Sequence, residues 1–185
     1  VTIMVLDEGM DSGPILAQRR IPISPKDTTE SLEAALAEMG AVLLTETLPK
    51  WFKHDLAPQP QREQDATYTK QISKQDGKID WRLPASELER RVRALHPWPG
   101  CYTHWQGKTL KVLEAVSFAR KTDGIEEKPG TIVAIPDDLG APFGVVTGDG
   151  ILGLRRVQLE GKKAVLATEF LRGQRQFIGQ TLGSA

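Results

Sequence analysis

The alternation of apolar and polar residues first predicts a strand, a polar loop and a second extended segment. Residues 1–6 (Val-Thr-Ile-Met-Val-Leu) are apolar and mostly β-branched, a pattern typical of a buried strand in a parallel sheet. Residues 7–14 form a turn cluster of Asp, Gly, Ser and Pro, and residues 15–23 are extended, with Pro22 indicating an edge or a strand end. A chain that opens inside a core strand is expected to be part of a longer protein.

A long amphipathic helix is expected next. Apolar residues recur there at helical spacing, Thr28 or Thr29 can cap the start, and Pro49 predicts an end at Leu48. Two aromatic residues are expected to dock that end of the helix, Trp51 and Phe52. Residues 1–53 are therefore interpreted as the end of an α/β domain.

The second half predicts a small, mostly antiparallel β barrel with a short helix. Residues 54–72 lack periodicity and carry two prolines, which indicates a linker before a domain at residues 73–185. A helix with one apolar face is expected over residues 84–95, and Gln106-Gly107 indicates a hairpin. The expected strands are 102–105, 108–116, 130–135, 144–146 and 150–159, with a short helix over 167–171.

The composition excludes several classes of protein. The chain has 185 residues, a mean hydropathy of −0.31 and a single cysteine, so neither a disulfide scaffold nor a disordered chain is expected. No apolar run approaches the roughly 20 residues of a membrane span, and no signal peptide is expected because an acidic loop follows the first strand at once. The expectation is a cytoplasmic monomer without a membrane partner.

Metal and thiol chemistry are not expected. The three histidines (His54, His96 and His104) lie on separate elements, and no ligand spacing connects them to Cys101. That cysteine has no local base and is interpreted as structural. Gly148-Asp149-Gly150 is interpreted as a hairpin turn, because no Lys-Ser/Thr pair follows it as in a phosphate loop.

The acidic loop is the first candidate for chemistry. Residues 7–14 carry three carboxylates at the end of a strand expected to belong to an α/β sheet, where ligands bind. Asp11 can accept a proton or orient a neighbouring imidazole. The alternative is that Asp-Ser-Gly-Pro forms a turn and has no catalytic role.

The basic residues of the second half are the other candidate. Residues 1–53 carry 5 Lys/Arg and 8 Asp/Glu, whereas residues 73–185 carry 17 and 13, which indicates a module that faces a polyanion. Tyr102 and Trp105 on one hairpin can stack on bases. The alternative is that the charges are solvated surface and the aromatics are core. The basic residues considered are Lys70, Lys74, Arg90, Arg91, Arg93, Lys108, Lys111, Arg155, Arg156, Lys162 and Lys163.

Several separated motifs resemble one family. The resemblance covers essentially the whole chain, because the motifs occur in the family's order. The first two are similar to the end of the folate-dependent formyltransferase domain, and the others to the C-terminal part of the methionyl-tRNA formyltransferase family. They are residues 1–4 (Val-Thr-Ile-Met), 10–16 (Met-Asp-Ser-Gly-Pro-Ile-Leu), 73–81 (Ser-Lys-Gln-Asp-Gly-Lys-Ile-Asp-Trp), 96–100 (His-Pro-Trp-Pro-Gly), 148–152 (Gly-Asp-Gly-Ile-Leu) and 161–163 (Gly-Lys-Lys).

The resemblance implies a fold and a reaction. It implies the end of a Rossmann-type formyltransferase domain in residues 1–53, the linker, and an OB-like barrel in residues 73–185. The reaction implied is transfer of the formyl group of 10-formyltetrahydrofolate to the amino group of methionyl initiator tRNA, in translation initiation and without a metal. Basic residues of the linker and barrel would face the tRNA, and replacing Lys70 or the Lys162/Lys163 pair is expected to weaken its binding.

The resemblance also implies which loop residues act. Asp11 corresponds to the catalytic Asp of the family, which orients a His and helps remove the amine proton, while an Asn stabilises the oxyanion. Glu8, Gly9 and Met10 would line the pterin pocket. The family's Asn, His and Ser-Leu-Leu-Pro loop have no counterpart in these residues, so the 185 residues alone are expected to be inactive.

Two alternatives remain open at this point. The first is a related folate-dependent formyltransferase that acts on an amino sugar nucleotide. The second is a stand-alone RNA-binding barrel that carries the remnant of a lost domain. The basic surplus of the second half favours tRNA over the sugar nucleotide, because a small acceptor does not need a broad cationic face.

Overall fold

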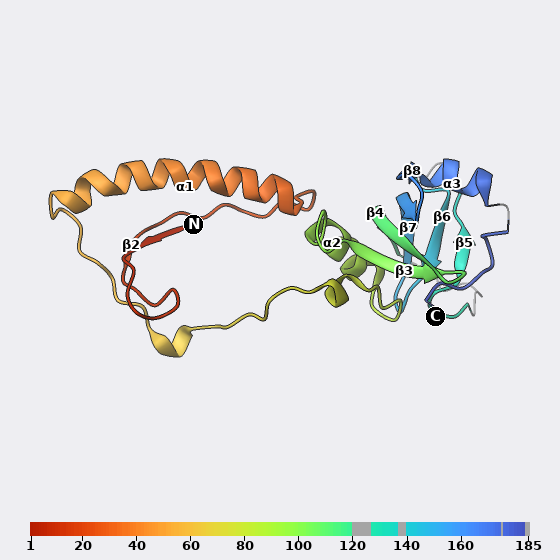
Figure 1. Cartoon of the computed structure of the whole chain (residues 1–185), viewed down its shortest axis with the longest axis horizontal. Coiled ribbons are helices and arrows are strands. Elements are labelled where there is room, and N and C mark those ends of the chain that lie inside the picture. Colours follow the sequence, from red (N-terminus) through yellow and green to blue (C-terminus); the bar gives the residue numbers. More distant parts are fainter. Residues whose placement is uncertain (120–126, 137–139, 175, 184–185) are drawn as a thin grey trace. The chain divides into compact units, whose positions relative to one another are not determined.

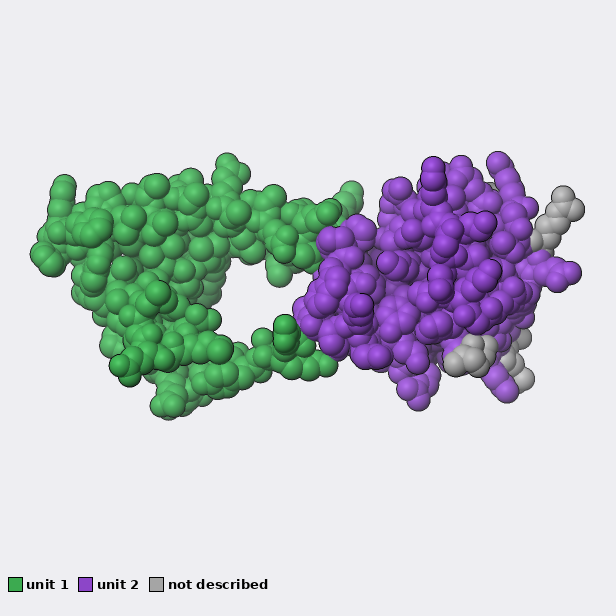
Figure 2. All heavy atoms as spheres, in the orientation of Figure 1, with its two compact units in different colours: residues 1–71 green, residues 72–185 purple. Residues whose placement is uncertain are grey.

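The chain forms two compact units. The structure, a computed structural model, describes residues 1–119, 127–136, 140–174 and 176–183. The first unit comprises residues 1–71 and the second residues 72–185 (Figures 1 and 2). Each unit is described separately below.

The first unit contains a two-stranded antiparallel sheet. Strand β1 (Thr2–Met4) pairs with β2 (Ile15–Gln18), and the loop between them returns the chain on itself. The sequence predicted a buried strand of a parallel sheet, whereas β1 pairs with β2 in an antiparallel hairpin. The residues of β1 are exposed or half-buried, so the expected burial was also wrong. An apolar β-branched run fits either arrangement, so its composition could not decide between them.

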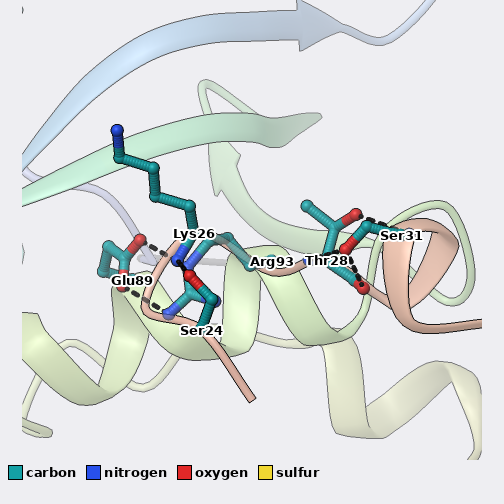
Figure 3. Close-up of polar contacts among 6 residues, drawn as sticks. All are labelled: Ser24, Lys26, Thr28, Ser31, Glu89 and Arg93. Carbon is teal, nitrogen blue, oxygen red and sulfur yellow. Dashed lines mark hydrogen bonds and ion pairs between the residues drawn. The ribbon is translucent and has the colours of Figure 1, made fainter. Parts of the chain in front are cut away.

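Helix α1 (Thr29–Phe52) follows the sheet. Thr28 caps it through a capping box: the Ser31 amide donates to Thr28 Oγ1 at 3.2 Å, and the Thr28 amide donates to Ser31 Oγ at 3.0 Å (Figure 3). The predicted end at Leu48 was wrong by one turn. Pro49 removes one donor close to the helix end, and the Lys53 amide still donates to the Pro49 carbonyl at 3.2 Å.

The aromatic residues at the end of α1 do not both anchor it. Trp51 is half-buried, but Phe52 is 74% exposed, so the docking expected of Phe52 is not seen. The side chains that α1 buries are Leu43 and Thr47. No helix in the described part of the chain is long and apolar enough to cross a membrane.

The second unit is built on a six-stranded antiparallel sheet. The strand order is β3-β4-β7-β6-β5, with β8 paired to β7 (Figure 1). The strands are β3 (Cys101–Trp105), β4 (Lys108–Phe118), β5 (Ile132–Ala134), β6 (Phe143–Val146), β7 (Ile151–Leu159) and β8 (Val165–Leu166). The helices are α2 (Ala85–Ala94) and α3 (Ala167–Gly173), with the short 3₁₀ turns η1 (Glu63–Asp65, in the first unit) and η2 (Lys74–Gly77). The expected hairpin is confirmed: Gln106 and Gly107 have φ of 49° and 72°, as a two-residue turn requires.

The C-terminal segment, residues 179–183, connects the two edges of this sheet. Its main chain exchanges two hydrogen bonds of 2.8 Å with Ile132 of β5. At its other end the Gly183 amide donates to the His104 carbonyl of β3 at 3.0 Å. Because both edges find partners in this segment, the sheet closes in the manner of a small barrel.

The core of the second unit is aromatic at its centre. Phe177 is fully buried, and its ring lies 5.0 Å from the rings of Trp105, Phe143 and Phe170 in near-perpendicular contacts. Helix α2 adds Leu88 and Val92 to the same cluster. The interior of the barrel is thus filled with packed side chains.

The sequence motifs of the second half meet in space through glycines. A Cβ on Gly77 would overlap the carbonyl oxygen of Gly100, and one on Gly148 would overlap that of Arg82. The Gly148 amide donates to the Trp81 carbonyl at 2.9 Å. In the same turn, the Asp149 carbonyl accepts a hydrogen bond from the Ala85 amide at the start of α2. Residues 73–81, 96–100 and 148–152 therefore pack as one junction, which only a residue without a side chain permits.

Candidate active-site loop and basic surface

The loop of residues 7–14 is organised around the carboxylate of Asp7. Asp7 Oδ1 accepts hydrogen bonds from the Gly9 amide at 3.0 Å and from Ser12 Oγ at 2.7 Å. At its base the Val5 amide donates to the Pro14 carbonyl at 3.0 Å. All three carboxylates of this loop are exposed, but Asp7 shapes the turn, whereas among the described residues the carboxylates of Glu8 and Asp11 form no hydrogen bond within the loop.

Asp11 lies at the tip of the loop in an uncommon backbone conformation. Its φ of 55° is in the left-handed region, which Asp tolerates better than most residues. Met10 beside it is 85% exposed, and Gly9 and Glu8 are exposed as well. The loop thus presents the carboxylate of Asp11 and the main chain of residues 8–10 on the surface of the first unit.

A residue that sequence reasoning missed holds this loop. Gln61, from the predicted linker, donates from Nε2 to the Asp11 carbonyl at 2.8 Å and to the Gly13 carbonyl at 2.7 Å. The linker is fixed there because Gln59 and Ile15 exchange two main-chain hydrogen bonds of 2.8 and 2.9 Å. No local motif indicated Gln61, since its partners lie 48 and 50 residues away in the chain.

The second unit brings part of the predicted basic set together on the outer face of its sheet. Lys111 of β4 lies opposite Tyr102 of β3 and opposite Gln158 of β7. Gln158 Nε2 donates to the Lys162 carbonyl at 3.0 Å, which holds the following turn next to this row. Among the described residues, no acidic side chain forms an ion pair with Lys111 or Lys162.

A bulge in β7 separates the two adjacent arginines. Arg156 pairs with Glu114 of β4, whereas Arg155 has no partner in the register and is the extra residue. Arg156 Nη1 lies 3.6 Å from the Glu114 carboxylate, on the same outer face as Lys111. Arg155 Nε donates to the Gly140 carbonyl at 3.0 Å, toward the β6 side of the unit. Tyr102, Lys111, Arg156, Gln158 and Lys162 are called the outer-face cluster below.

Lys108 lies at the hairpin end of the same sheet beside an acidic partner. The Thr109 amide donates to the Glu160 carboxylate at 2.8 Å. This hydrogen bond, together with the charge of Lys108, lowers the pKa of Glu160 below its ordinary value. Lys108 thus faces a carboxylate that stays ionised, and it contributes less net positive charge than Lys111.

The other predicted basic residues lie elsewhere. Arg93 of α2 is half-buried and pairs with Glu89 at 2.7 Å (Figure 3), and this pairing offsets its charge. Arg90, on the same helix, is exposed, as are Lys74 in η2 and Lys163 beside Lys162. Lys70 belongs to the first unit and is exposed.

The aromatic residues of the hairpin divide between surface and core. Tyr102 is half-buried on the outer face, where its ring meets that of His104 edge to face at 5.8 Å. Trp105 is 5% exposed and packs in the core, so its candidacy for base stacking was wrong. Strand alternation explains this, because Tyr102 and Trp105 stand on opposite faces of β3.

The structure also gives the surroundings of the cysteine and of one ion pair in the second unit. Cys101 is buried, and this burial raises the pKa of its thiol to about 11, as suits a structural residue. Arg82 donates from Nε and Nη2 to the Asp80 carboxylate at 2.8 and 2.7 Å, which lowers the pKa of Asp80 to about 2. In the described part of the chain, no three His, Cys, Asp or Glu side chains converge as metal ligands.

Comparison with known proteins gives matches along the whole chain. A methionyl-tRNA formyltransferase from Roseiflexus sp. (strain RS-1) is 43% identical over 185 residues, which are 100% of this chain and 55% of that protein. One from Dehalococcoides mccartyi is 40% identical over 185 residues, 99% of this chain and 56% of that protein. The chain thus spans about half the length of the curated relatives it matches.

Solved structures share the fold at lower identity. A crystal structure of a HypX variant from Aquifex aeolicus superposes with a TM-score of 0.66 at 20% identity, over 97% of this chain and 31% of that one. HypX in complex with tetrahydrofolic acid gives the same score over 96% of this chain and 30% of that one. Residues 1–48 match the family described as formyl transferase. Because residues 71–175 also match its C-terminal domain (Formyl transferase, C-terminal domain), the chain belongs to the formyl transferase family.

Proposed function

We propose that the whole protein transfers the formyl group of 10-formyltetrahydrofolate to the amino group of methionyl initiator tRNA, the first aminoacyl-tRNA of translation. In this proposal the loop of residues 7–14 contributes to the reaction centre and the second unit binds the tRNA. The relatives that match both units are named methionyl-tRNA formyltransferases, which supports this acceptor.

Asp11 would act as the residue that orients a His and accepts charge from it as the amine loses its proton. The exposed position of Asp11 at a fixed loop tip supports this role, because a group that assists proton transfer must reach its partner. Glu8, Gly9 and Met10 present main-chain groups beside it that would line the folate pocket. HypX, a protein of the same fold, has been solved in complex with tetrahydrofolic acid, which is consistent with folate as the formyl donor.

The observation that carries the choice of tRNA is the outer-face cluster. It joins two lysines without acidic partners among the described residues, an arginine and the half-buried Tyr102 on one face of a sheet. A protein that binds the phosphates of a nucleic acid needs clustered cations of this kind, and bases can stack on an aromatic ring at the surface of a sheet. An amino sugar nucleotide would need a pocket of its own size and would leave this face unused.

Acceptor specificity in the whole protein tests the proposal. We expect formyl transfer from 10-formyltetrahydrofolate to methionyl-tRNA and none to an amino sugar nucleotide. Asp11→Asn should lower kcat at least about 100-fold, because general acid–base assistance contributes about 10²–10⁴. Glu63→Gln, which changes an exposed carboxylate in the same unit, is the matched control and should leave kcat unchanged. Transfer to the sugar nucleotide instead would overturn the tRNA assignment, and no transfer to either acceptor would overturn formyl transfer.

A further inference from the structure

The loop that carries Asp11 is clamped by one side chain from a distant segment. Gln61 uses a single nitrogen, Nε2, to donate to the carbonyls of Asp11 and Gly13, at 2.8 and 2.7 Å. A carboxamide has two N–H donors, so these two carbonyls use its full donor capacity. The same nitrogen lies 3.9 Å from Met4 Sδ, which places the clamp over the end of β1.

The position of Gln61 is itself fixed by the main chain. Gln59 pairs with Ile15 through two hydrogen bonds and forms an isolated antiparallel β-bridge with the first residue of β2. The intervening Pro60 restricts the backbone between that pair and Gln61. The Gln61 side chain therefore reaches the loop from an anchored segment.

The loop of residues 7–14 is tightly packed at Gly13 and is held in part by a residue from outside it, Gln61. A Cβ on Gly13 would overlap the Val5 carbonyl oxygen, so no larger side chain fits at that position. Asp11 has a left-handed φ of 55°, a conformation that is uncommon for a residue other than glycine and persists where surrounding contacts hold it. Asp7 holds residues 9 and 12, whereas Gln61 holds the carbonyls on both sides of Ser12.

We propose that Gln61 is a positioning residue for the reaction: its amide fixes the main chain of Asp11 and thereby the direction of the Asp11 carboxylate. This inference rests on the proposed function, because it assigns a role relative to catalytic Asp11. It also gives a part in catalysis to the segment that the sequence predicts as a linker, a role that the composition of this segment does not show. Displacing a reacting group by about 1 Å can cost about 100-fold in rate.

Kinetics of the whole protein test the clamp with a matched pair of variants. Gln61→Met removes both donors and keeps the length of the side chain. Gln59→Met makes the same change two residues away, where only the main chain of residue 59 forms hydrogen bonds among the described residues. We expect Gln61→Met to lower kcat about 10- to 100-fold with KM for both substrates within about twofold, and Gln59→Met to have no effect. Equal kinetics for the two variants would overturn the proposal.

A double-mutant cycle separates positioning of Asp11 from general stabilisation. In an Asp11→Asn background, Gln61→Met should cause no further loss of kcat beyond about twofold, because the carboxylate it positions is already absent. A loss of the same size in both backgrounds would show that Gln61 acts independently of Asp11, and would contradict the proposal.

Amide hydrogen exchange gives a readout that does not depend on activity. In the whole protein, Gln61→Met should speed exchange of the Val5 and Gly9 amides, whose acceptors belong to the loop, and Gln59→Met should not. Unchanged exchange in Gln61→Met would overturn the clamp even in an active enzyme. Faster exchange in a protein that formylates neither acceptor would support the clamp and overturn the proposed function alone.

Discussion

Binding of tRNA by the outer-face cluster can be tested by removing its two lysines without acidic partners. Lys111 lies between Tyr102 and Gln158 in the sheet register, and Gln158 holds the Lys162 turn next to them. Arg156 is less informative, because the Glu114 carboxylate lies 3.6 Å from its guanidinium and offsets part of its positive charge. The perturbation is therefore the double substitution Lys111→Gln and Lys162→Gln.

The expected loss follows from counterion release. Each phosphate contact contributes about 0.7–0.9 to the slope of log K against log salt, the lower value for single strands and the higher for a double helix. Removing two contacts should reduce the slope by about 1.4–1.8. The counterion-release contribution to log K vanishes at about 1 M salt. At about 0.1 M salt, loss of the same two contacts should therefore weaken binding about 25- to 60-fold.

The assay is fluorescence anisotropy of labelled initiator tRNA titrated with the 185-residue chain at several salt concentrations. Arg172→Gln, which removes one exposed positive charge from α3, is the control and should change the slope by less than one contact. Tyr102→Ala provides an internal contrast, because loss of a stacking ring weakens binding by about 1–3 kcal/mol without changing the slope. An unchanged slope in the double variant would refute the assignment of this face to tRNA.

Three further predictions concern the second unit and its junction. Phe177→Ala should lower the free energy of unfolding, measured by urea titration, by about 3–5 kcal/mol, because the fully buried ring of Phe177 contacts three other rings. The neighbouring Ile178 is partly exposed, and Ile178→Ala should lower it by less than about 1.5 kcal/mol. Gly148→Ala should lower the free energy of unfolding by about 2–4 kcal/mol, because its Cβ would overlap the Arg82 carbonyl and strain the hydrogen bond from the amide of residue 148 to the Trp81 carbonyl. In Gly173→Ala the added Cβ meets no atom within 4 Å, so this substitution should be neutral; a similar cost for both variants would contradict this. Asp80 should titrate at a pKa of about 2 by carboxyl NMR and return toward 3.8 in Arg82→Gln. Because the folded-state pKa is lowered, the contribution of Asp80 to stability is present above pH 3.8 and is lost as the pH falls toward 2.

Much of the second unit could be predicted from the chain because local signals agree with tertiary packing there. The helix over residues 84–95 has one apolar face, and the structure places Leu88 and Val92 of that face in the core. The hairpin at Gln106-Gly107 has turn chemistry that few other conformations satisfy. Strand β8 and the closing segment at residues 179–183 could not be predicted, because they pair through main-chain groups and show no alternation of side chains.

The candidate sites were predictable to different degrees for a similar reason. Alternation along β3 already assigns Tyr102 and Trp105 to opposite faces, so the error about Trp105 could have been avoided from the sequence. The bulge that turns Arg155 away from Arg156 could not, because it depends on the register with β4. Gln61 was equally hidden, since a side-chain amide that binds main-chain carbonyls about 50 residues away leaves no local pattern.

The residues that make the family recognisable and those proposed to act are largely different, and the structure gives a physical reason. A Cβ on Gly77 or Gly148 would overlap main-chain carbonyls of the neighbouring segments, and Gly100 has a positive φ of 74°. These motifs therefore reflect the packing and the backbone geometry of the junction. Lys111 and Gln158, by contrast, are ordinary outward positions of strands, where packing accepts many polar residues. A family resemblance built on such glycines therefore supports the fold directly, whereas the acceptor must be decided by the charges and rings that the fold displays.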